Sequence, residues 1–410
     1  IHLGERDCSV QRRNQKIIEE APSPAVTPAL RAQMGAAAVA LAKVVSYENA
    51  GTVEFLVDAA GAFYFLEMNT RIQVEHPVTE AITGLNLIQM QFDAAMGKKL
   101  ALTQNDVAIS GHAIETRLCA EDPADGFRPQ AGALAAWTID GARVDAGFGA
   151  GDRVPSDYDS MLAKIICHGP TRADALHASA QALKNARVLG LATNRAYLVD
   201  LLNDPVFAAG DATTGWLGER TPFEAAHLTG DLAAAAALAL AHGQGEGWSS
   251  TGARRSLVTL AARGEARVIA VTNGAVEGLT TVSCADGVLR TAANGHTLDY
   301  IFACDGARIH VAHGAQDAMF EDVTYAPAEP KGAGSDGVLK APMDGKIVAV
   351  RAEPGAPVKK GDVLVILEAM KMEHEIAVGA DGTLESVSVK PGDQVSARQV
   401  LAAVAPASAG

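Results

Sequence analysis

The chain has 410 residues, of which 48% are hydrophobic and 20% are charged, and its 34 Lys and Arg against 48 Asp and Glu give a formal net charge of −14. Such a length predicts about two to four domains, and the apolar content excludes wholesale disorder. The acidic balance argues against a nucleic-acid partner. The longest apolar run, residues 232–241, is far too short to cross a bilayer, so we expect no membrane span.

Five cysteines are scattered through the chain without a CxxC pair: Cys8, Cys119, Cys167, Cys284 and Cys304. An odd number of cysteines in a long chain is typical of a reducing compartment, and not of a disulfide scaffold or a zinc site. Because no signal-peptide pattern occurs, we expect a cytoplasmic protein, or one of the mitochondrial matrix in a eukaryote. The opening residues, Ile-His-Leu-Gly-Glu-Arg, are typical of a domain interior, so we expect a portion of a longer polypeptide.

Residues 1–220 combine strand-like and helix-like patterns, which predicts an α/β or α+β composition. Residues 53–57 and 62–66 are expected to be two strands of a hairpin, because both runs are apolar and the connection between them is short. Apolar residues at helical spacing predict helices over residues 81–96 and 172–186.

Residues 221–330 differ in character from the preceding residues. An alanine-rich helix is predicted over residues 231–242, because Asp231 can cap its start and Gly243 ends it. Short β-like runs separated by turn signals follow, over residues 268–272, 279–284, 288–290, 300–304 and 308–312. They predict a small β-barrel or sandwich with one helix. The helix has no charged residue between its ends, so we expect the barrel to cover part of it and a partner subunit to cover the rest.

The last segment repeats itself with an offset of 37 residues, so that Gly345 recurs as Gly382. Two copies of one β-unit therefore occupy about residues 338–405. A two-fold β-sandwich built from the two copies would have a tight turn at its midpoint. That turn would place Lys371 at its tip.

The residues around this lysine are Ala369-Met370-Lys371-Met372. Within such a repeat they resemble the biotin carboxyl carrier domain of biotin-dependent carboxylases. The resemblance implies that a biotin protein ligase attaches biotin covalently to Lys371, between Met370 and Met372. The lipoyl domain has the same fold and a lysine at the same turn, but the two methionines favour biotin. An ordinary surface lysine is the other alternative, and the duplicated β-unit argues against it.

A dense polar stretch follows the second predicted strand. Alternate residues on a strand share one face, so Glu67, Asn69 and Arg71 can point into one site. Oxygen ligands from Glu54, Glu67 and Asn69 suit a hard Mg²⁺ that also holds phosphates. Gln73 and Glu75 continue the alternation if the chain stays extended. The alternative is a solvated polar face with structural ion pairs.

The segment from residue 64 to residue 77 closely resembles the ATP-grasp catalytic segment of biotin carboxylases. The resemblance implies Mg²⁺ or Mn²⁺ at three ligands: Glu54, Glu67 and Asn69. It also implies bicarbonate at Arg71, Gln73 and Val74, with Glu75 as the base that deprotonates it. His76 is expected to be structural and bonded to the backbone, because Pro77 restricts the chain there.

Two further segments agree with this resemblance. Residues 5–16 are rich in hydrogen-bond donors, and the family would place Gln11 near the nucleotide and Lys16 at bicarbonate. The family usually has histidine where this chain has Asn14, and asparagine cannot carry a proton charge, so nucleotide affinity or the pH profile is expected to differ. The alternative for this segment is a charged surface loop.

Residues 111–123 resemble the opening of the C-terminal subdomain of biotin carboxylases. In that family Arg117 would lie beside the ureido oxygen of biotin and stabilise the negative charge that develops there. The alternative for Arg117 is an ordinary ion pair with Glu115 or Glu121.

Together these resemblances imply the biotin-bearing subunit of a two-subunit acyl-CoA carboxylase, a ligase that uses ATP and bicarbonate to carboxylate biotin. The expected fold is multidomain α+β. It comprises the C-terminal part of an ATP-grasp biotin carboxylase (1–220), a barrel that docks the carboxyltransferase (beta) subunit (221–330), and a biotinyl/lipoyl-type flattened β-sandwich (336–405). A linker rich in Pro, Ala and Gly, residues 326–336, would leave this carrier mobile.

Two points stay open at this stage. A glycine-rich lid and phosphate-gripping lysines are absent from the sequence, so a non-catalytic carrier and assembly module is the alternative function. The acyl group would be selected on the partner of the expected hetero-oligomer. Methylcrotonyl-, propionyl-, acetyl- and geranyl-CoA therefore all remain candidates.

Overall fold

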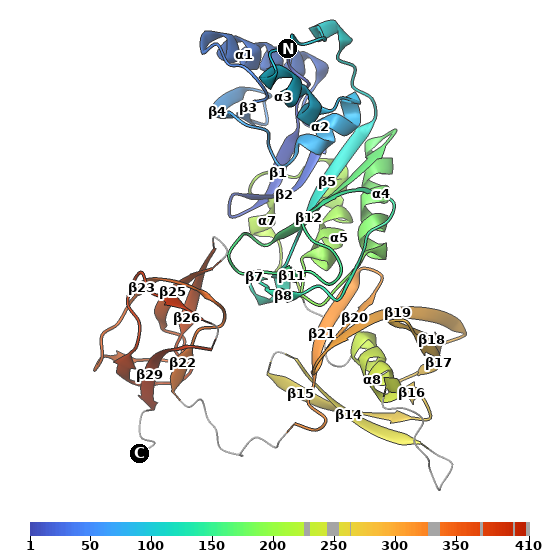
Figure 1. Ribbon diagram of the computed structural model, residues 1–410, viewed down its shortest axis with the longest axis vertical. Helices are drawn as coiled ribbons and strands as arrows, with labels where there is room; N and C mark the ends of the chain where they lie inside the picture. Colours follow the sequence, from blue (N-terminus) through green and yellow to red (C-terminus); the bar gives the residue numbers. More distant parts are fainter. Residues whose placement is uncertain are drawn as a thin grey trace.

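A computed structural model describes residues 1–224, 230–243, 254–262, 264–326, 337–369, 372–396 and 398–406. Figure 1 shows three folded regions in chain order: an α+β region coloured blue to green, a yellow and orange barrel around one helix, and a red β-sandwich. No helix in the described ranges has the length and apolar character that a membrane crossing requires.

A five-stranded antiparallel sheet forms the centre of the α+β region. Its strands, in spatial order, are β1 (Asp7–Arg12), β2 (Gln15–Ala21), β5 (His112–Cys119), β12 (Met161–Gly169) and β10 (Arg143–Ala146). Helix α4 (Arg172–Asn185) packs on β5 and β12, and α5 (Arg195–Leu202) packs on α4. The buried core includes Leu118, Leu162 and Leu183. The predicted helix over 172–186 is confirmed, and a capping box of Thr171 and Asp174 explains its start.

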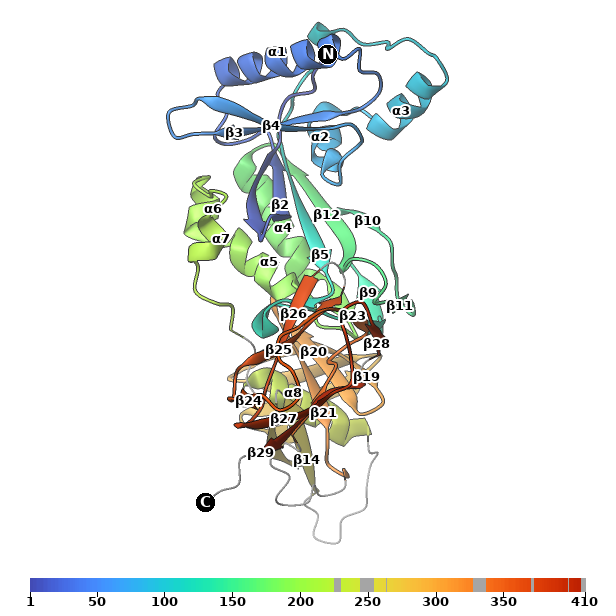
Figure 2. The ribbon, with the colours of Figure 1, turned by 90° about the vertical axis from the view of Figure 1, so that its left-hand side faces the viewer.

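The predicted hairpin is also confirmed, as β3 (Thr52–Val57) and β4 (Phe63–Asn69). Figure 2 shows this hairpin lying across the upper end of the central sheet, below α1 (Pro28–Val44). The predicted single helix over 81–96 is wrong, because the structure has α2 (His76–Thr83) and α3 (Leu87–Ala95).

The break between these two helices has a local cause. Gly84 ends α2 in the left-handed conformation, with φ of 70°. The side chain of Asn86 then accepts a hydrogen bond from the backbone N–H of Gln89 and so caps α3.

Short elements complete the α+β region. They are β6 (Glu121–Asp122), β7 (Arg128–Pro129), β8 (Gly132–Ala133), β9 (Ala136–Thr138), β11 (Arg153–Val154), β13 (Arg187–Leu189), α6 (Pro205–Ala209) and α7 (Trp216–Glu219), with 3₁₀ turns at Gln104–Asp106 and Pro123–Asp125. Phe207 and Trp216 of the last two helices stack on each other and belong to the core.

Eight strands that follow the α+β region close into a barrel. They are β14 (Arg255–Ala262), β15 (Glu265–Thr272), β16 (Ala275–Val276), β17 (Leu279–Ala285), β18 (Val288–Ala293), β19 (His296–Asp305), β20 (Arg308–His313) and β21 (Gln316–Asp322). The five predicted runs all lie within these strands, but β14, β16 and β21 were not predicted.

The predicted helix over 231–242 is confirmed as α8 (Asp231–Gly243), which lies inside the barrel and contacts all eight strands (Figure 1). Nine of its residues are buried, Leu232 and Leu238 among them. The expectation that a partner subunit covers part of this helix is therefore wrong. The barrel has a continuous wall on every side of the helix, so the chain buries its own apolar residues without help.

One arginine fastens the barrel to the α+β region. The guanidinium of Arg195, on α5, is 1% exposed and donates hydrogen bonds to the carbonyl oxygens of Leu183, Gly314 and Gln316. It also lies 3.2 Å from a carboxylate oxygen of Asp317 on β21. A buried cation with this many partners in both regions ties them together.

The C-terminal region consists of two four-stranded sheets. Strands β22 (Val338–Lys340), β29 (Val400–Pro406), β27 (Gly382–Val387) and β24 (Pro357–Val358) form one, and β26 (Met372–Ala377), β25 (Val363–Ala369), β23 (Gly345–Val350) and β28 (Gln394–Val395) form the other. Strands β23, β24 and β25 recur as β27, β28 and β29, and each later strand begins 37 residues after its counterpart. The repeat predicted from the sequence is confirmed, and the short strands β24 and β28 each pair in the opposite sheet.

Candidate active site

The candidate site lies where the β1–β2 hairpin, the β3–β4 hairpin and the chain before α2 meet. Lys16, near the start of β2, donates to Oε1 of Glu75 at 2.8 Å and to Oε1 of Glu54 at 3.0 Å. This ammonium therefore joins two carboxylates that are far apart in the sequence. Gln11 is the cross-strand partner of Lys16 on β1, and partners in an antiparallel pair share a face of the sheet.

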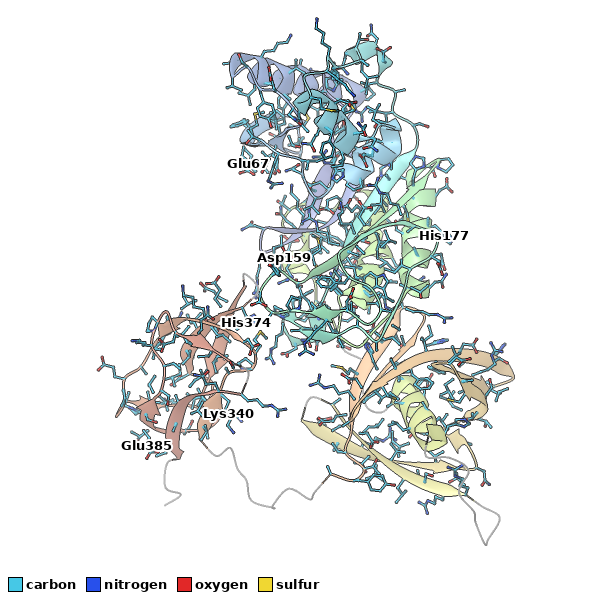
Figure 3. The ribbon with its side chains drawn as sticks, viewed as in Figure 1. Glu67, Asp159, His177, Lys340, His374 and Glu385 are labelled. Carbon is cyan, nitrogen blue, oxygen red and sulfur yellow. The ribbon has the colours of Figure 1, made fainter. Side chains whose placement is uncertain are left out.

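The two glutamates predicted as metal ligands face each other across the β3–β4 hairpin, where Glu54 and Glu67 are cross-strand partners. Figure 3 shows Glu67 below α1, on the side of this hairpin. The side-chain amide of Asn69 donates to Glu54 at 3.1 Å and to Glu67 at 2.8 Å. If the amide rotates by half a turn, its oxygen joins two carboxylates at one point, a donor set that suits Mg²⁺ or Mn²⁺.

In the portion of the chain that the structure describes, no group of three or more His, Cys, Asp or Glu side chains gathers around a possible metal. The mixed set of two carboxylates and one amide is therefore the candidate, and ATP phosphates would have to complete its coordination.

Gln73 and Glu75 reach the site by a different route from the one predicted. Strand β4 ends at Asn69, and Glu75 stands at the N-cap of α2, so the strand alternation does not extend to either residue. Gln73 is held at both ends: its amide donates to Glu54 at 2.5 Å, and its oxygen accepts from Arg6 at 2.6 Å. Among the described residues, the Arg71 side chain bonds only to its neighbours, Asn69 and the Ile72 carbonyl, and it stays exposed.

Glu75 is 2% exposed and has one cation on each carboxylate oxygen. Lys16 donates to Oε1, and Arg117 donates to Oε2 at 3.0 Å. Burial alone would raise the pKa of Glu75, but the hydrogen bond and charge of Lys16, with the charge of Arg6, hold it below its ordinary value. The carboxylate is therefore ionised at neutral pH and can accept a proton.

Arg117 pairs with carboxylates other than the two that the sequence suggested. Its Nε donates to Oε1 of Glu19 at 2.6 Å, and its Nη2 contacts both this oxygen and Oε2 of Glu75. Glu121 pairs instead with Arg12, at 3.1 Å. No ion pair of Glu115 occurs among the described residues, and both of its carboxylate oxygens are buried without a hydrogen-bond partner there.

Two residues of the site were missed in the sequence. Arg6 donates to the hydroxyls of Thr79 and Thr52 as well as to Gln73, so it joins three segments. Glu19 is completely buried. The sequence carried a signal for Glu19, because two acidic residues stand next to each other inside the apolar run of β2.

The structure also places three other residues from the sequence analysis: Val74, His76 and Asn14. Val74 accepts a hydrogen bond from Lys164 through its carbonyl, at 2.9 Å. His76 bonds the Gln73 carbonyl through Nδ1, at 2.8 Å, which confirms the predicted structural role. Asn14 and Arg13 form the two-residue turn between β1 and β2, both with positive φ, and asparagine is well suited to such a turn.

The predicted biotin-attachment residues Met370 and Lys371 lie outside the described residues. Strand β25 ends at Ala369 and β26 begins at Met372, and these two residues are cross-strand partners. His374, on β26, is labelled in Figure 3. The pKa of the His374 ring is lowered first by burial and then by the charges of Arg128 and Arg13. Because Arg13 belongs to the β1–β2 turn, this end of the sandwich lies near that turn.

Three family models match separate segments of the chain. Residues 1–103 match the ATP-binding domain of the carbamoyl-phosphate synthase L chain. Residues 115–219 match the biotin carboxylase C-terminal domain, and residues 337–404 match a model described as biotin-requiring enzyme.

Curated relatives match across almost the whole chain. The alpha chain of propionyl-CoA carboxylase from Ruegeria pomeroyi is 36% identical, over 98% of this chain and 67% of its own length. The chain belongs to the alpha subunits of the biotin-dependent acyl-CoA carboxylases. The mitochondrial methylcrotonoyl-CoA carboxylase subunit alpha of Glycine max is another member, 34% identical over 98% of this chain and 65% of its own length. The chain thus spans about two thirds of the length of these alpha subunits.

Solved structures support this family for the α+β region. The biotin carboxylase domain of a 2-oxoglutarate carboxylase bound to bicarbonate is 43% identical with a TM-score of 0.53, and the match covers 53% of this chain and 50% of that one. The same domain from Hydrogenobacter thermophilus, in complex with MgADP and bicarbonate, also has a TM-score of 0.53 at 43% identity, over 53% of this chain and 49% of that one. The expected fold class is confirmed by these matches, and the match of residues 337–404 to the biotin-requiring enzyme model supports the expected biotin.

Proposed function

We propose that the complete subunit uses ATP and bicarbonate to carboxylate biotin carried on Lys371, and that a carboxyltransferase subunit then transfers the carboxyl group to an acyl-CoA. The observation that carries this proposal is the Glu75 carboxylate, buried between Lys16 and Arg117. A buried, ionised carboxylate with a cation on each side is suited to take one proton from a small anion.

Within this proposal Lys16 and Arg71 bind the oxygens of bicarbonate, and Glu75 takes its proton. Gln73, held between Arg6 and Glu54, offers an amide at the same place. Val74 contributes backbone, which Lys164 holds through the carbonyl. Gln11 would bind the nucleotide from the same face of the hairpin as Lys16.

Glu54, Glu67 and Asn69 would hold Mg²⁺ or Mn²⁺, and the metal, when bound, offsets the charge of the ATP phosphates. Biotin supplies the ureido nitrogen that receives the carboxyl group. Arg117 donates toward the ureido oxygen, where negative charge develops, and so stabilises the transition state.

The test is a Glu75→Gln substitution in the full-length subunit. It keeps the shape of the side chain but removes the proton acceptor, so bicarbonate-dependent ATP cleavage should fall by about 10²–10⁴-fold. Glu80→Gln is the matched control, because Glu80 is a buried carboxylate on the same helix whose partner is Arg143 and not Lys16. Equal rates in Glu75→Gln and Glu80→Gln would contradict the assignment.

Biotin attachment is tested separately by intact mass after treatment with biotin protein ligase. The chain should gain one biotinyl group, and the Lys371→Arg variant should gain none. Lys360→Arg is the control, since Lys360 is an exposed lysine of the same sandwich. A lipoyl increment, or biotin on the Lys371→Arg variant, would contradict the proposal.

A further inference from the structure

A row of charged side chains crosses one face of the central sheet, beneath the candidate site. Glu19 on β2 is the cross-strand partner of Glu115 on β5. Arg117 lies two residues along β5, on the same face, and its own cross-strand partner is Lys164 on β12. Three strands therefore present four ionisable groups to the segment that carries Glu75.

The two carboxylates of this row differ in their contacts. One oxygen of Glu19 contacts both Nε and Nη2 of Arg117, and its other oxygen has no partner among the described residues. Neither oxygen of Glu115 has one there. Burial, then the charge of Glu19, raise the pKa of Glu115 to about 9, so Glu115 holds a proton at neutral pH. Arg117 favours the ionised form of Glu19, whose pKa burial raises only to about 7.

We propose that Glu19 is a positioning residue for Arg117: from behind the site its Oε1 contacts both Nε and Nη2 of the guanidinium and keeps Nη2 within reach of Glu75. This inference rests on the proposed function, in which Arg117 stabilises the ureido oxygen. Glu19 is fully buried and lies behind the arginine, so it acts through Arg117 and touches no substrate.

The need for this second carboxylate follows from the reaction itself. When Glu75 accepts the proton of bicarbonate, it loses its charge and with it most of its attraction for Arg117. Glu19 still contacts Nε and Nη2 of the guanidinium and keeps it in place. Nη2 gives up its bond to Glu75 and can donate to the oxygen on which charge develops. A preoriented donor stabilises a transition state because it does not have to reorganise.

The experiment compares two reactions of the full-length subunit that carries Lys371→Arg, so that free biotin is the only acceptor. The first reaction is bicarbonate-dependent ATP cleavage without biotin, and the second is carboxylation of free biotin. In Glu19→Gln, the rate of ATP cleavage should stay within about threefold of the parent rate. The kcat of biotin carboxylation should fall by about 10- to 100-fold, which is less than the effect of removing a whole oxyanion donor. The KM for ATP should stay unchanged.

Glu115→Gln is the matched control, because Glu115 faces Glu19 on the same sheet, is equally buried, and is already neutral. Both reactions of this variant should stay within about threefold. Glu19→Asp keeps the charge and should recover part of the biotin reaction. The inference would be overturned if Glu19→Gln lowered the rates of both reactions equally. It would also be overturned if Glu115→Gln lowered the rate of biotin carboxylation alone. If the parent subunit itself carboxylates no biotin, the proposed function fails instead.

Discussion

The charge of each buried carboxylate near the site is decided by the side chains that face it. Glu75 has Lys16 and Arg117 on its two oxygens and is held ionised. Glu115 is as deeply buried, but burial and the charge of Glu19 raise its pKa by more than the charges of Lys164 and Arg117 lower it. Two residues of the same type, a few strands apart, therefore carry opposite protonation states at neutral pH.

This difference gives Glu115 a measurable effect on stability. Its pKa is about 9 in the folded chain against an ordinary value of 4.5, so the folded state binds the proton more tightly. The stabilisation is fully present below about pH 4.5 and is lost as pH rises through about 9, by at most ~1.4 kcal/mol per pH unit. Between pH 5 and pH 9, the Tm of Glu115→Gln should therefore rise relative to the Tm of the parent. A difference in Tm that does not change with pH would contradict it.

Local sequence predicted some site residues for the right reason and others for the wrong one. Glu54 and Glu67 were found because a hairpin register depends on adjacent strands only. Glu75 was found although its predicted strand alternation is wrong, since β4 ends before it. Glu19 was missed because its partner Arg117 is 98 residues away, and pairing between such distant strands leaves no periodic signal in either.

At the scale of elements, the carrier repeat rests on glycines where two strands approach closely. A Cβ on Gly345 would lie 2.6 Å from the carbonyl oxygen of Glu368, and a Cβ on Gly382 would lie 2.1 Å from that of Ala405. Both distances are far shorter than any real contact. The recurrence of glycine after 37 residues is therefore a packing requirement met once in each sheet. Helix breaks such as Gly84 are harder to predict, because an amphipathic pattern continues across them.

Gly382→Ala should therefore destabilise the carrier by about 1–3 kcal/mol or more, because the carbonyl in its way is main chain and β27 must shift from β29. Chemical denaturation of the full chain, followed at the carrier, measures the loss. Thr383→Ala is the control, since Thr383 is the next residue on β27 and is exposed. Similar midpoints for the two variants would contradict the packing argument.

At the scale of the whole molecule, Arg195 links the barrel to the α+β region. Its guanidinium is buried between them and bonds carbonyls on both sides. A small β-barrel or sandwich with one helix was predicted from the strand runs and the apolar helix. The attachment through Arg195 was not predicted, because an arginine in an α-helix gives no sign of burial.

Asp317→Ala should loosen this attachment, because it leaves the Arg195 guanidinium buried without its carboxylate. The remaining carbonyl partners limit the loss to about 2–3 kcal/mol, below that of a fully broken buried pair. Calorimetry should show the single transition of the α+β region and the barrel separating into two. Asp299→Ala removes an exposed ion pair with Arg290 instead and should leave the profile unchanged. One unchanged transition in Asp317→Ala would contradict the prediction.

Docking of the carboxyltransferase subunit stays a prediction for the barrel, but its outer wall must carry it, since α8 is enclosed. Leu257 on β14 and Val268 on β15 are 52% and 60% exposed and are diagonal neighbours across the strand pair. The double variant Leu257→Glu, Val268→Glu should no longer co-purify with the transferase, while still taking biotin. Val282→Glu, at 59% exposure on β17, is the control. If the complex survives the double variant, this face is not the interface.

The exchange of β24 and β28 between the two sheets also bears on the order of events during synthesis. Each sheet is completed by a short strand from the other copy, so neither half of the repeat is a folding unit by itself. The ribosome makes residues 370 and 371 before β28 and β29 exist. If a ligase attaches biotin to Lys371, as proposed, and requires a folded carrier, attachment can occur only after the second copy has been made. Attachment of biotin would thus report that a carrier has been synthesised to its end.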